Sequence, residues 1–247
     1  MKETVKDICI NEFDPNALEE MQAINKIIGA VKPLESSEKV CIKNALHRTI
    51  SSTIRAPINV PSFRNSAMDG YAINLNDLKD NNFRLSEVGV SFAGKPFTSS
   101  LRKGETVRVM TGALIPKNAD AVIMKEMVSS KGKIINFTNN IIENQNIRFI
   151  GEDIKKGEIV FKRGDEIKFP SLSILSSLGI EHVDVLCKPK ISFFSSGDEL
   201  VPTGKKLRQG QIYDSNRYLL RGLLEDLPVI FSDLGVVKDK KKYLVKK

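Results

Sequence analysis

Two polar clusters in the last quarter of the chain carry the side chains best suited to chemistry. The first is Ser-Gly-Asp-Glu-Leu at residues 196–200, and the second is Asp-Ser-Asn at residues 214–216. The adjacent carboxylates Asp198 and Glu199 suit Mg²⁺, a hard cation that prefers oxygen ligands. The second cluster would offer free N–H groups to a phosphate or oxyanion if it begins a helix. It is equally typical of a helix cap that binds no ligand.

Three further polar motifs could contribute to a site. Residues 61–72 place Asp69 beside a glycine, and a Thr-Gly pair at 111–112 follows a strand-like run. A hydroxyl and bare amides at a strand end can bind an anion. Residues 151–153 read Gly-Glu-Asp. Because these residue types also stabilise ordinary turns, their chemistry taken alone favours turns over a site.

A helix and a β-rich region must position the motif at residues 61–72. Asp14-Pro15 predicts a helix start, since Asp suits the N-cap and Pro the first helical position. Apolar residues at helical spacing follow, and the helix should end before Pro33. A second, shorter helix is expected over 43–49. From 57 to 166, Gly and Pro separate short apolar runs, which is typical of a small all-β unit. Strands are expected at 106–110 and 121–124.

The last third of the chain has the pattern of an α/β domain. A helix over 170–178 is expected to precede a buried strand over 190–195. A polar loop, a helix over 216–227 and a strand over 229–234 complete one βαβ unit. Because ligands bind such sheets at the carboxyl ends of the strands, the loop at 195–199 is expected to lie at a binding site.

Several motifs in one fixed order resemble those of the molybdopterin molybdenumtransferases, whose eukaryotic relatives include the gephyrin E domain. They are Pro-x-Phe-x-Asn-Ser-Ala-Met-Asp-Gly-Tyr-Ala at 61–72, Met-Thr-Gly-Ala-x-x-Pro at 110–116, Gly-Glu-Asp-Ile at 151–154, and Ser-Gly-Asp-Glu-Leu with Gly-Gln-Ile-Tyr-Asp-Ser-Asn at 196–200 and 210–216. The first motif is highly specific. The resemblance runs from about residue 14 to about residue 239.

The resemblance implies an elongated, multi-domain α+β fold. β-rich N-terminal segments with an inserted all-β lobe would be followed by the start of a molybdopterin-binding α/β three-layer domain. The expected boundaries are an N-terminal helix at 1–30, a β-rich linker and lobe region at 31–187 with the lobe at about 56–145, and a partial α/β domain at 188–247. The family's later Gly-Gly-x-Ser segment, Pro-Gly-Asn-Pro loop and last β-barrel do not occur in this sequence. The chain is therefore expected to be truncated within the α/β domain.

The resemblance also implies a transferase that inserts molybdate into adenylated molybdopterin, releasing AMP and giving molybdenum cofactor. Mg²⁺ is the implied cofactor. A homodimer is expected, because the family builds its site from the α/β domain of one subunit and the β lobe of the other. Other proteins of molybdenum cofactor biosynthesis are further expected partners.

Individual residues receive roles from the motifs that they match. The catalytic residues implied are Asp69, Asp153 and Glu199. The metal ligands expected are Asp198, Glu199, Asp214 and, after the third strand, Asp239. The substrate-binding residues implied are Thr111, Ser196, Gly197, Asp214, Ser215 and Asn216. Molybdate and phosphates are anions, so carboxylates would need a cation between them and the substrate.

Two positions depart from the family pattern. Ser196 stands where the family usually has Thr, and the hydroxyl is kept. His47 stands where a Gly is usual, so that turn is expected to differ.

Composition excludes several other classes of protein. The chain has 247 residues, of which 41% are hydrophobic, and no apolar run approaches the roughly 20 residues that a membrane helix needs. The N-terminus has no apolar stretch typical of a secretory signal, so a cytoplasmic location without membrane contact is expected. Three widely spaced cysteines argue against a disulfide framework or a cysteine metal knuckle.

Two alternatives belong to other classes. The formal charge of +8 owes most to residues 238–247, which hold six Lys and one Asp. Such a tail can bind nucleic acid, but it is equally typical of a solvated end in a Lys-rich sequence, and no nucleic-acid partner is expected. The other alternative is a non-catalytic, truncated fragment of the transferase that acts at most as a dimerising module.

Overall fold

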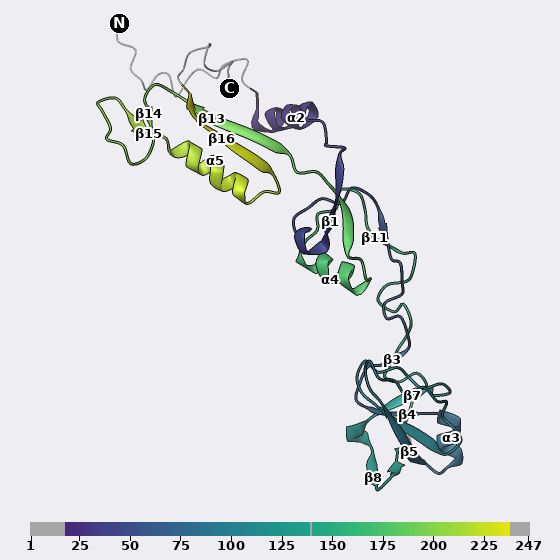
Figure 1. Ribbon diagram of the computed structural model, residues 1–247. Helices are drawn as coiled ribbons and strands as arrows, with labels where there is room; N and C mark the ends of the chain where they lie inside the picture. The colour runs from purple at the N-terminus through teal and green to yellow at the C-terminus, as the bar shows by residue number, and fades with distance from the viewer. Residues whose placement is uncertain (1–17, 139, 238–247) are drawn as a thin grey trace. The chain divides into compact units, whose positions relative to one another are not determined.

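The computed structural model describes residues 18–138 and 140–237 (Figure 1). The chain divides into two compact units. Unit 1 comprises Met1–Glu38 and Leu186–Lys247, and unit 2 comprises Lys39–Val185. The sequence thus enters unit 1, builds unit 2 and returns to unit 1.

The main feature of unit 2 is a six-stranded sheet with the strand order β7-β4-β6-β5-β9-β8. Its strands are β4 (Gly70–Ile73), β5 (Arg84–Ser91), β6 (Glu105–Val109), β7 (Ala121–Met124), β8 (Ser129–Lys131) and β9 (Ile134–Asn136). Neighbouring strands are antiparallel except for β5 and β6, which run parallel. The strands predicted at 106–110 and 121–124 are therefore confirmed as β6 and β7.

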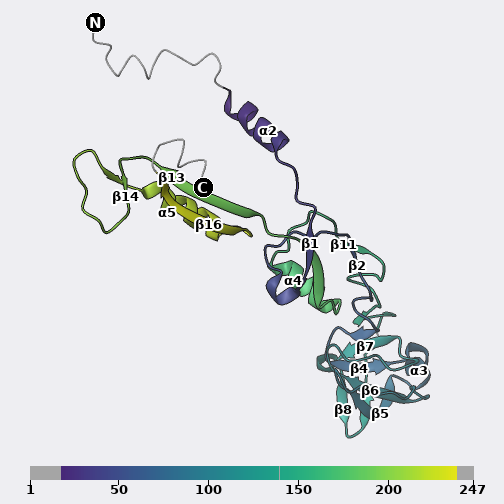
Figure 2. The same cartoon turned by 45° about the horizontal axis from the view of Figure 1, so that its top comes forward.

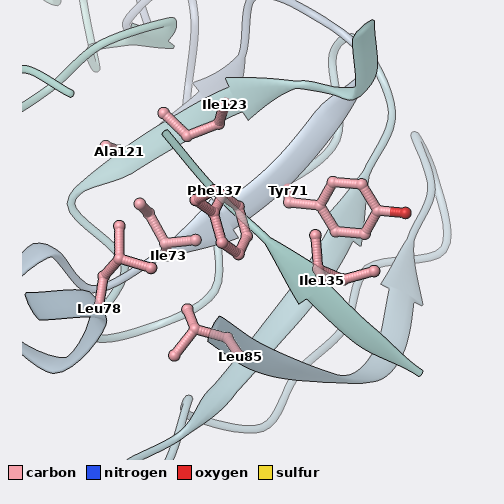
Figure 3. Close-up of a cluster of buried hydrophobic side chains, with 8 residues drawn as sticks. All are labelled: Tyr71, Ile73, Leu78, Leu85, Ala121, Ile123, Ile135 and Phe137. Carbon is pink, nitrogen blue, oxygen red and sulfur yellow. The ribbon is translucent and has the colours of Figure 1, made fainter. Parts of the chain in front are cut away.

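Apolar side chains cover both faces of this sheet. Successive residues of a strand point to opposite faces, and along β4 the side chains of Tyr71 and Ile73 join one buried cluster while Ala72 joins another. Figure 3 shows the first cluster, in which the rings of Tyr71 and Phe137 meet edge to face with their centroids 6.2 Å apart. Burial on two faces fixes the register of β4 and so the position of the motif that precedes it.

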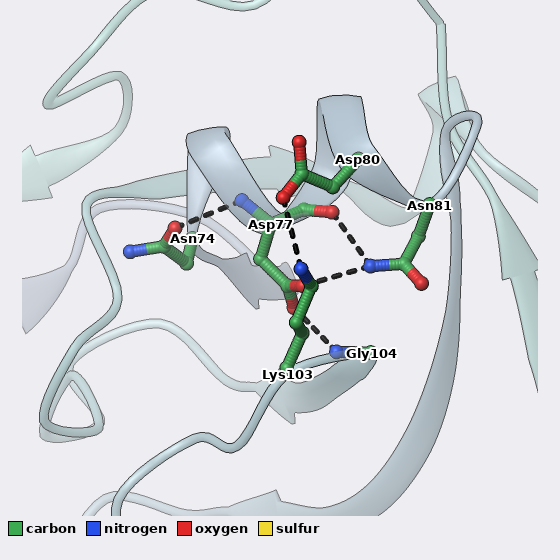
Figure 4. Close-up of polar contacts among 6 residues, drawn as sticks. All are labelled: Asn74, Asp77, Asp80, Asn81, Lys103 and Gly104. Atoms are coloured by element: carbon green, nitrogen blue, oxygen red, sulfur yellow. Dashed lines mark hydrogen bonds and ion pairs between the residues drawn. The ribbon is translucent and has the colours of Figure 1, made fainter.

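A polar network joins helix α3 (Leu75–Asp80) to the start of β6 (Figure 4). Asn74 caps the helix by accepting a hydrogen bond from the Asp77 amide at 3.0 Å. The Asp77 carboxylate accepts hydrogen bonds from the Gly104 amide and the Asn81 side chain. Lys103 forms an exposed ion pair with Asp80 at 3.0 Å. These contacts order the connection between β5 and β6.

The remainder of unit 2 contains short strands and one helix. The strand pairs are β2 (Ile54–Arg55) with β11 (Ile159–Phe161), β3 (Asn65–Ser66) with β10 (Ile147–Arg148), and β1 (Ser37–Cys41) with β12 (His182–Leu186). Helix α4 (Phe169–Ser177) agrees with the prediction over 170–178, and Leu175 and Leu178 are buried. Leu175 belongs to a core cluster that also contains Ile50 and Ile167.

The helix predicted over 43–49 is wrong. Only the 3-10 turn η1 (Ile42–Asn44) forms there. His47 has a φ of 61°, which interrupts a right-handed helix. Thr49 and Ile50 then form β-bridges to Glu166 and Val185, so strand pairing replaces the helical pattern.

Unit 1 contains the parallel strands β13 (Lys190–Ser196) and β16 (Ile230–Val237), with helix α5 (Ser215–Glu225) beside them (Figures 1 and 2). Between β13 and α5, the chain forms the parallel pair β14 (Leu200–Val201) and β15 (Ile212–Tyr213). The βαβ crossover predicted from sequence is confirmed. The expected burial of β13 is wrong, because its side chains alternate between exposed and half-buried. Among the described residues only β16 pairs with it, so its other edge has no strand partner.

Helix α2 (Glu20–Ala30) is the first described helix of unit 1. It begins later than the predicted start at Asp14-Pro15, two residues that lie outside the described part of the chain. Leu18 and Glu19 precede the helix, and acidic Glu20 occupies its first turn, where a negative charge is favourable. The helix ends before Pro33, as predicted. Among the described residues, no helix is long and apolar enough to cross a membrane.

Candidate functional site

Asp69 and Thr111, which are far apart in the sequence, meet beside the six-stranded sheet of unit 2. Asp69 immediately precedes β4, and Thr111 follows β6. The backbone amide and the hydroxyl of Thr111 each donate a hydrogen bond to Asp69 Oδ1 at 2.8 Å. Lys125 Nζ lies 3.7 Å from the other carboxylate oxygen. The three residues form a half-exposed polar cluster, called here the Asp69 cluster.

These contacts determine the charge of Asp69. The Thr111 amide, and after it the Thr111 hydroxyl, lower the pKa of the Asp69 carboxyl, and the positive charge of Lys125 adds to the effect. Hydrogen bonds that stabilise a carboxylate favour its ionised form. Asp69 is therefore an anion at neutral pH, able to accept hydrogen bonds or attract a cation.

Two motifs pack together to form the Asp69 cluster. The buried Ser66 donates its amide to the Ala113 carbonyl at 3.0 Å and accepts the Gly112 amide on its own carbonyl at 2.8 Å. Next to Asp69, Gly70 allows β4 and β7 to approach closely, because a Cβ there would lie 2.0 Å from the carbonyl oxygen of Ile123. The residue types of the two motifs thus serve both the strand contact and the site.

Asp153 lies in a separate ion-paired turn. Arg148 Nη2 donates to Asp153 Oδ1 at 2.5 Å, and Arg148 Nε lies 3.3 Å from Glu152 Oε1. The Gly151 amide donates to the Pro61 carbonyl at 2.9 Å, so this turn is attached to the first residue of the motif that contains Asp69. The motif at 151–154 is therefore joined to the motif at 61–72.

A pocket of about 260 Å³ lies at the carboxyl end of β13 in unit 1. It contains four of the substrate-binding residues that the resemblance implied. They are Ser196, Asp214, Ser215 and Asn216. Other parts of the wall are apolar and include Phe194 and Leu220. The pocket combines hydroxyl and amide groups with an apolar surface, as ligand sites in proteins commonly do.

Asp214 is the most buried polar residue of this pocket, with 3% of its surface exposed. Its Oδ1 accepts a hydrogen bond from the Arg217 amide at 3.3 Å and so caps α5, as the sequence predicted. Its Oδ2 is buried and has no hydrogen-bond partner among the described residues. Buried carboxylate oxygens are normally paired, so this oxygen is available to a cation or a donor of a ligand.

Glu199 folds back over the loop that follows β13. A Cβ at Gly197 would lie 2.7 Å from Glu199 Oε1, so the glycine accommodates this carboxylate. Neither Asp198 nor Glu199 lines the pocket. Across residues 18–138 and 140–237, no three His, Cys, Asp or Glu side chains gather in an arrangement that could hold a metal ion. Asp239, the fourth expected ligand, lies outside the described residues.

Three cations near these groups were not identified from the sequence. Lys125 and Arg148 contact Asp69 and Asp153, and Arg217 Nε lies 2.8 Å from both carboxylate oxygens of Asp233. Burial raises the pKa of Asp233, but hydrogen bonds from the Gly235 amide and Arg217 outweigh it and lower the pKa overall. The spacing of these cations in the sequence does not indicate which carboxylates they contact. Only the three-dimensional contacts show their role.

Comparison with known proteins identifies similar chains. Residues 17–179 match the family described as the MoeA N-terminal region (domain I and II). The chain is 45% identical over 219 residues to a molybdopterin molybdenumtransferase of Haemophilus influenzae, covering 88% of this chain and 54% of that protein. It is 28% identical over 230 residues to one of Staphylococcus aureus, covering 92% and 54%.

A similar fold occurs in a solved structure. The crystal structure of a molybdopterin biosynthesis MoeA protein from Pyrococcus horikoshii matches with a TM-score of 0.83 and 32% sequence identity, covering 92% of this chain and 62% of that one. The chain spans about half the length of the curated relatives that it matches.

Proposed function

The chain belongs to the MoeA family, and from this premise we propose that it acts in molybdenum cofactor biosynthesis as a molybdopterin molybdenumtransferase. The proposed reaction inserts molybdate into adenylated molybdopterin and releases AMP. The observation that carries the proposal is the similarity to named transferases across most of the chain, which includes the segments bearing Asp69 and Asp214.

The pocket of unit 1 supports a role in binding an anionic substrate. Hydroxyl groups of Ser196 and Ser215 line it, together with the amide side chain of Asn216. Ser215 also begins α5, where unpaired backbone N–H groups and the helix dipole favour an oxyanion. Donors held in fixed positions stabilise developing negative charge without reorganising. We assign the phosphate or molybdate oxygens of the substrate to these donors.

The residues of this pocket fit a magnesium ion that is bound together with the substrate. The buried, unpartnered Asp214 Oδ2 supplies the kind of oxygen that Mg²⁺ prefers. Protein sites often provide only one or two carboxylates to this ion and leave other positions to phosphates and water. Asp214 would hold the ion, while Asp198 and Glu199, the other ligands expected from the sequence, lie on the loop after β13 and do not line the pocket. When bound, Mg²⁺ would polarise the phosphate as a Lewis acid.

The Asp69 cluster would act on the substrate from a second direction. Asp69 is ionised and held in place by Thr111, so it is suited to orienting a group of the substrate through its charge and hydrogen bonds. The family resemblance supports a homodimer in which this cluster and the pocket of unit 1 come from different subunits. Asp153 is proposed as a further acidic residue of the same site.

The test is AMP release from adenylated molybdopterin in the presence of molybdate and Mg²⁺. Asp69→Asn and Asp214→Asn should each lower the rate by about 100-fold or more, the usual scale for loss of a positioned acid–base or charged group. Asp80→Asn and Asp226→Asn remove one exposed carboxylate from each unit and should leave the rate within twofold. A rate unaffected by the first two changes would contradict the assigned site.

A second candidate function is a non-catalytic module. The chain spans 54% of its Haemophilus influenzae relative, and α5 exposes Leu219 and Leu223 at 62% and 57%. Exposed apolar side chains of this kind are typical of a surface that binds another polypeptide, which favours an interaction module. Absence of AMP release from a folded chain, under conditions in which that relative turns over, would favour this candidate.

A further inference from the structure

The connection between β14 and β15, residues 202–211, carries a concentrated positive charge that the proposed function has not used. Lys205, Lys206 and Arg208 lie within four positions, and the segment contains no acidic residue. All three residues are exposed. The segment, called here the basic loop, extends beyond β14 and β15 in both views of unit 1 (Figures 1 and 2).

Hydrogen bonds attach the basic loop to the wall of the pocket. Tyr213, which lines the pocket, donates its hydroxyl to the carbonyl of Lys205 at 2.9 Å. The hydroxyls of Thr203 and Tyr218 lie 2.8 Å apart and connect the start of the loop to α5. The backbone of Lys205 is therefore held beside Tyr213, one of the residues that line the pocket.

A second set of contacts shapes the far end of the loop. The Arg208 amide donates to the Gln211 side chain at 3.0 Å, and the Gln211 amide donates to the Arg208 carbonyl at 3.1 Å. These two bonds close a tight turn. The turn joins Arg208 to Gln211, and Arg208 follows the two lysines within three positions of the sequence, so the like charges of the loop repel one another.

The charges of the basic loop have no counter-charge in the described part of unit 1. The neighbouring cations of α5 behave differently, since Arg217 pairs with Asp233 and Arg221 pairs with Glu225. Among the described residues, no carboxylate forms an ion pair with Lys205, Lys206 or Arg208. A bound anion would relieve the repulsion among the three cations.

We propose that the basic loop binds the pyrophosphate group of a ligand whose ring system enters the pocket of unit 1. This inference rests on the proposed function and names the loop that would recognise the phosphate-rich part of the substrate. Guanidinium groups bind phosphate oxygens in a forked geometry, and ammonium groups bind them as point charges. The apolar side chains of Phe194 and Leu220 offer a surface to a flat ring.

The experiment measures binding of inorganic pyrophosphate and of ADP by calorimetry, with adenosine as the phosphate-free probe. The test variant is Lys205→Gln with Lys206→Gln and Arg208→Gln. The matched control removes the same charge from unit 2 through Lys117→Gln, Lys131→Gln and Lys133→Gln. All six side chains are exposed, so both variants should keep the wild-type unfolding temperature.

We expect the loop variant to bind pyrophosphate and ADP at least tenfold more weakly than the wild type does. Its affinity should also depend less on the salt concentration. The control variant should bind as the wild type does. Equal binding by the loop variant, or no binding of either probe by the wild type, would overturn the proposal. AMP release distinguishes failure of this inference from failure of the proposed function. If the loop variant turns over with an unchanged KM, only this inference fails. If the loop variant loses pyrophosphate binding but the wild type releases no AMP, only the proposed function fails.

Discussion

At the scale of single residues, the charge of Asp69 depends on a neighbour 42 positions away. Two hydrogen bonds from Thr111 and the charge of Lys125 keep the carboxyl ionised. Its folded pKa lies below the ordinary value of 3.8, so the stability that these contacts contribute is present above that value. It is lost as the pH falls through the lower, folded pKa. The cluster is therefore unaffected by changes of pH near neutrality.

Replacing the Thr111 side chain tests this account of Asp69. Thr111→Ala removes the hydroxyl donor and keeps the amide donor, so the pKa of Asp69 should rise partly toward 3.8. Lys125→Gln should raise it less, because the charge of Lys125 is a smaller cause than either hydrogen bond from Thr111. Carbon NMR titration of the Asp69 carboxyl measures both shifts. A pKa at or above 3.8 in the wild type would contradict the geometry.

The glycine beside Asp69 gives a second residue-scale prediction. Gly70→Ala places a Cβ where the carbonyl oxygen of Ile123 would be 2.0 Å away. Strands β4 and β7 would have to separate, and overpacking of this kind should cost about 3 kcal/mol of unfolding free energy. Urea unfolding measures the loss. Val88→Ala, at a residue that is 41% exposed on the same sheet, is the control and should change stability by less than about 0.5 kcal/mol.

The sequence indicated part of this chemistry. Asp69 and Thr111 were identified from motifs that resemble a family, and the structure shows them in direct contact. Lys125 and Arg148 were missed because a lone cation in a Lys-rich sequence carries no signal of its partner. The two readings of Asp214, a helix cap and a ligand-binding group, are compatible, since one oxygen caps α5 and the other has no partner.

At the scale of elements, the start of α5 combines a structural and a proposed binding role in Asp214. Asn caps helices about as well as Asp, so Asp214→Asn should change stability without metal by less than about 1 kcal/mol. Binding of Mg²⁺ to the folded state should stabilise the wild type, by about 2.7 kcal/mol at 100 times the dissociation constant. The variant should lose this gain. Thermal unfolding in the presence of AMP, with and without Mg²⁺, measures it, with Asp226→Asn as the control.

An equal Mg²⁺-dependent stabilisation of the Asp214→Asn variant would show that the ion binds elsewhere. The element predictions themselves succeeded for β7, which is a continuous apolar run, and for α4, which has a proline in its first turn. They failed over 43–49, where long-range strand contacts at Thr49 and Ile50 override a local helical pattern. A short segment carries too little periodicity to reveal such contacts.

At the scale of the whole molecule, large apolar side chains remain exposed on both described helices of unit 1. Ile27 and Ile28 of α2 are 64% and 65% exposed, and Leu219 of α5 is 62% exposed. Exposed apolar stripes of this kind are typical of surfaces that bind another polypeptide. The βαβ pattern of this unit could be predicted from the sequence. The exposure of its apolar side chains could not, because burial depends on what packs against an element.

The proposed homodimer can be tested through these exposed helices. Light scattering of the chain at micromolar concentration should give a mass near twice 27.5 kDa. Ile27→Glu with Leu223→Glu places charges on exposed apolar positions and should shift the mass toward the monomer if these helices contribute to the interface. Lys131→Glu with Lys133→Glu on unit 2 is the control. A monomer from the unaltered chain at all accessible concentrations would contradict the dimer.

A single-turnover assay is the sharpest test of the proposed molybdate-dependent release of AMP by this chain. The 247-residue chain and the full-length Haemophilus influenzae relative would be mixed separately with adenylated molybdopterin and Mg²⁺, with and without molybdate. We predict AMP release from both proteins that requires molybdate. AMP release that does not depend on molybdate, or none from the folded chain while the relative turns over, would contradict the claim.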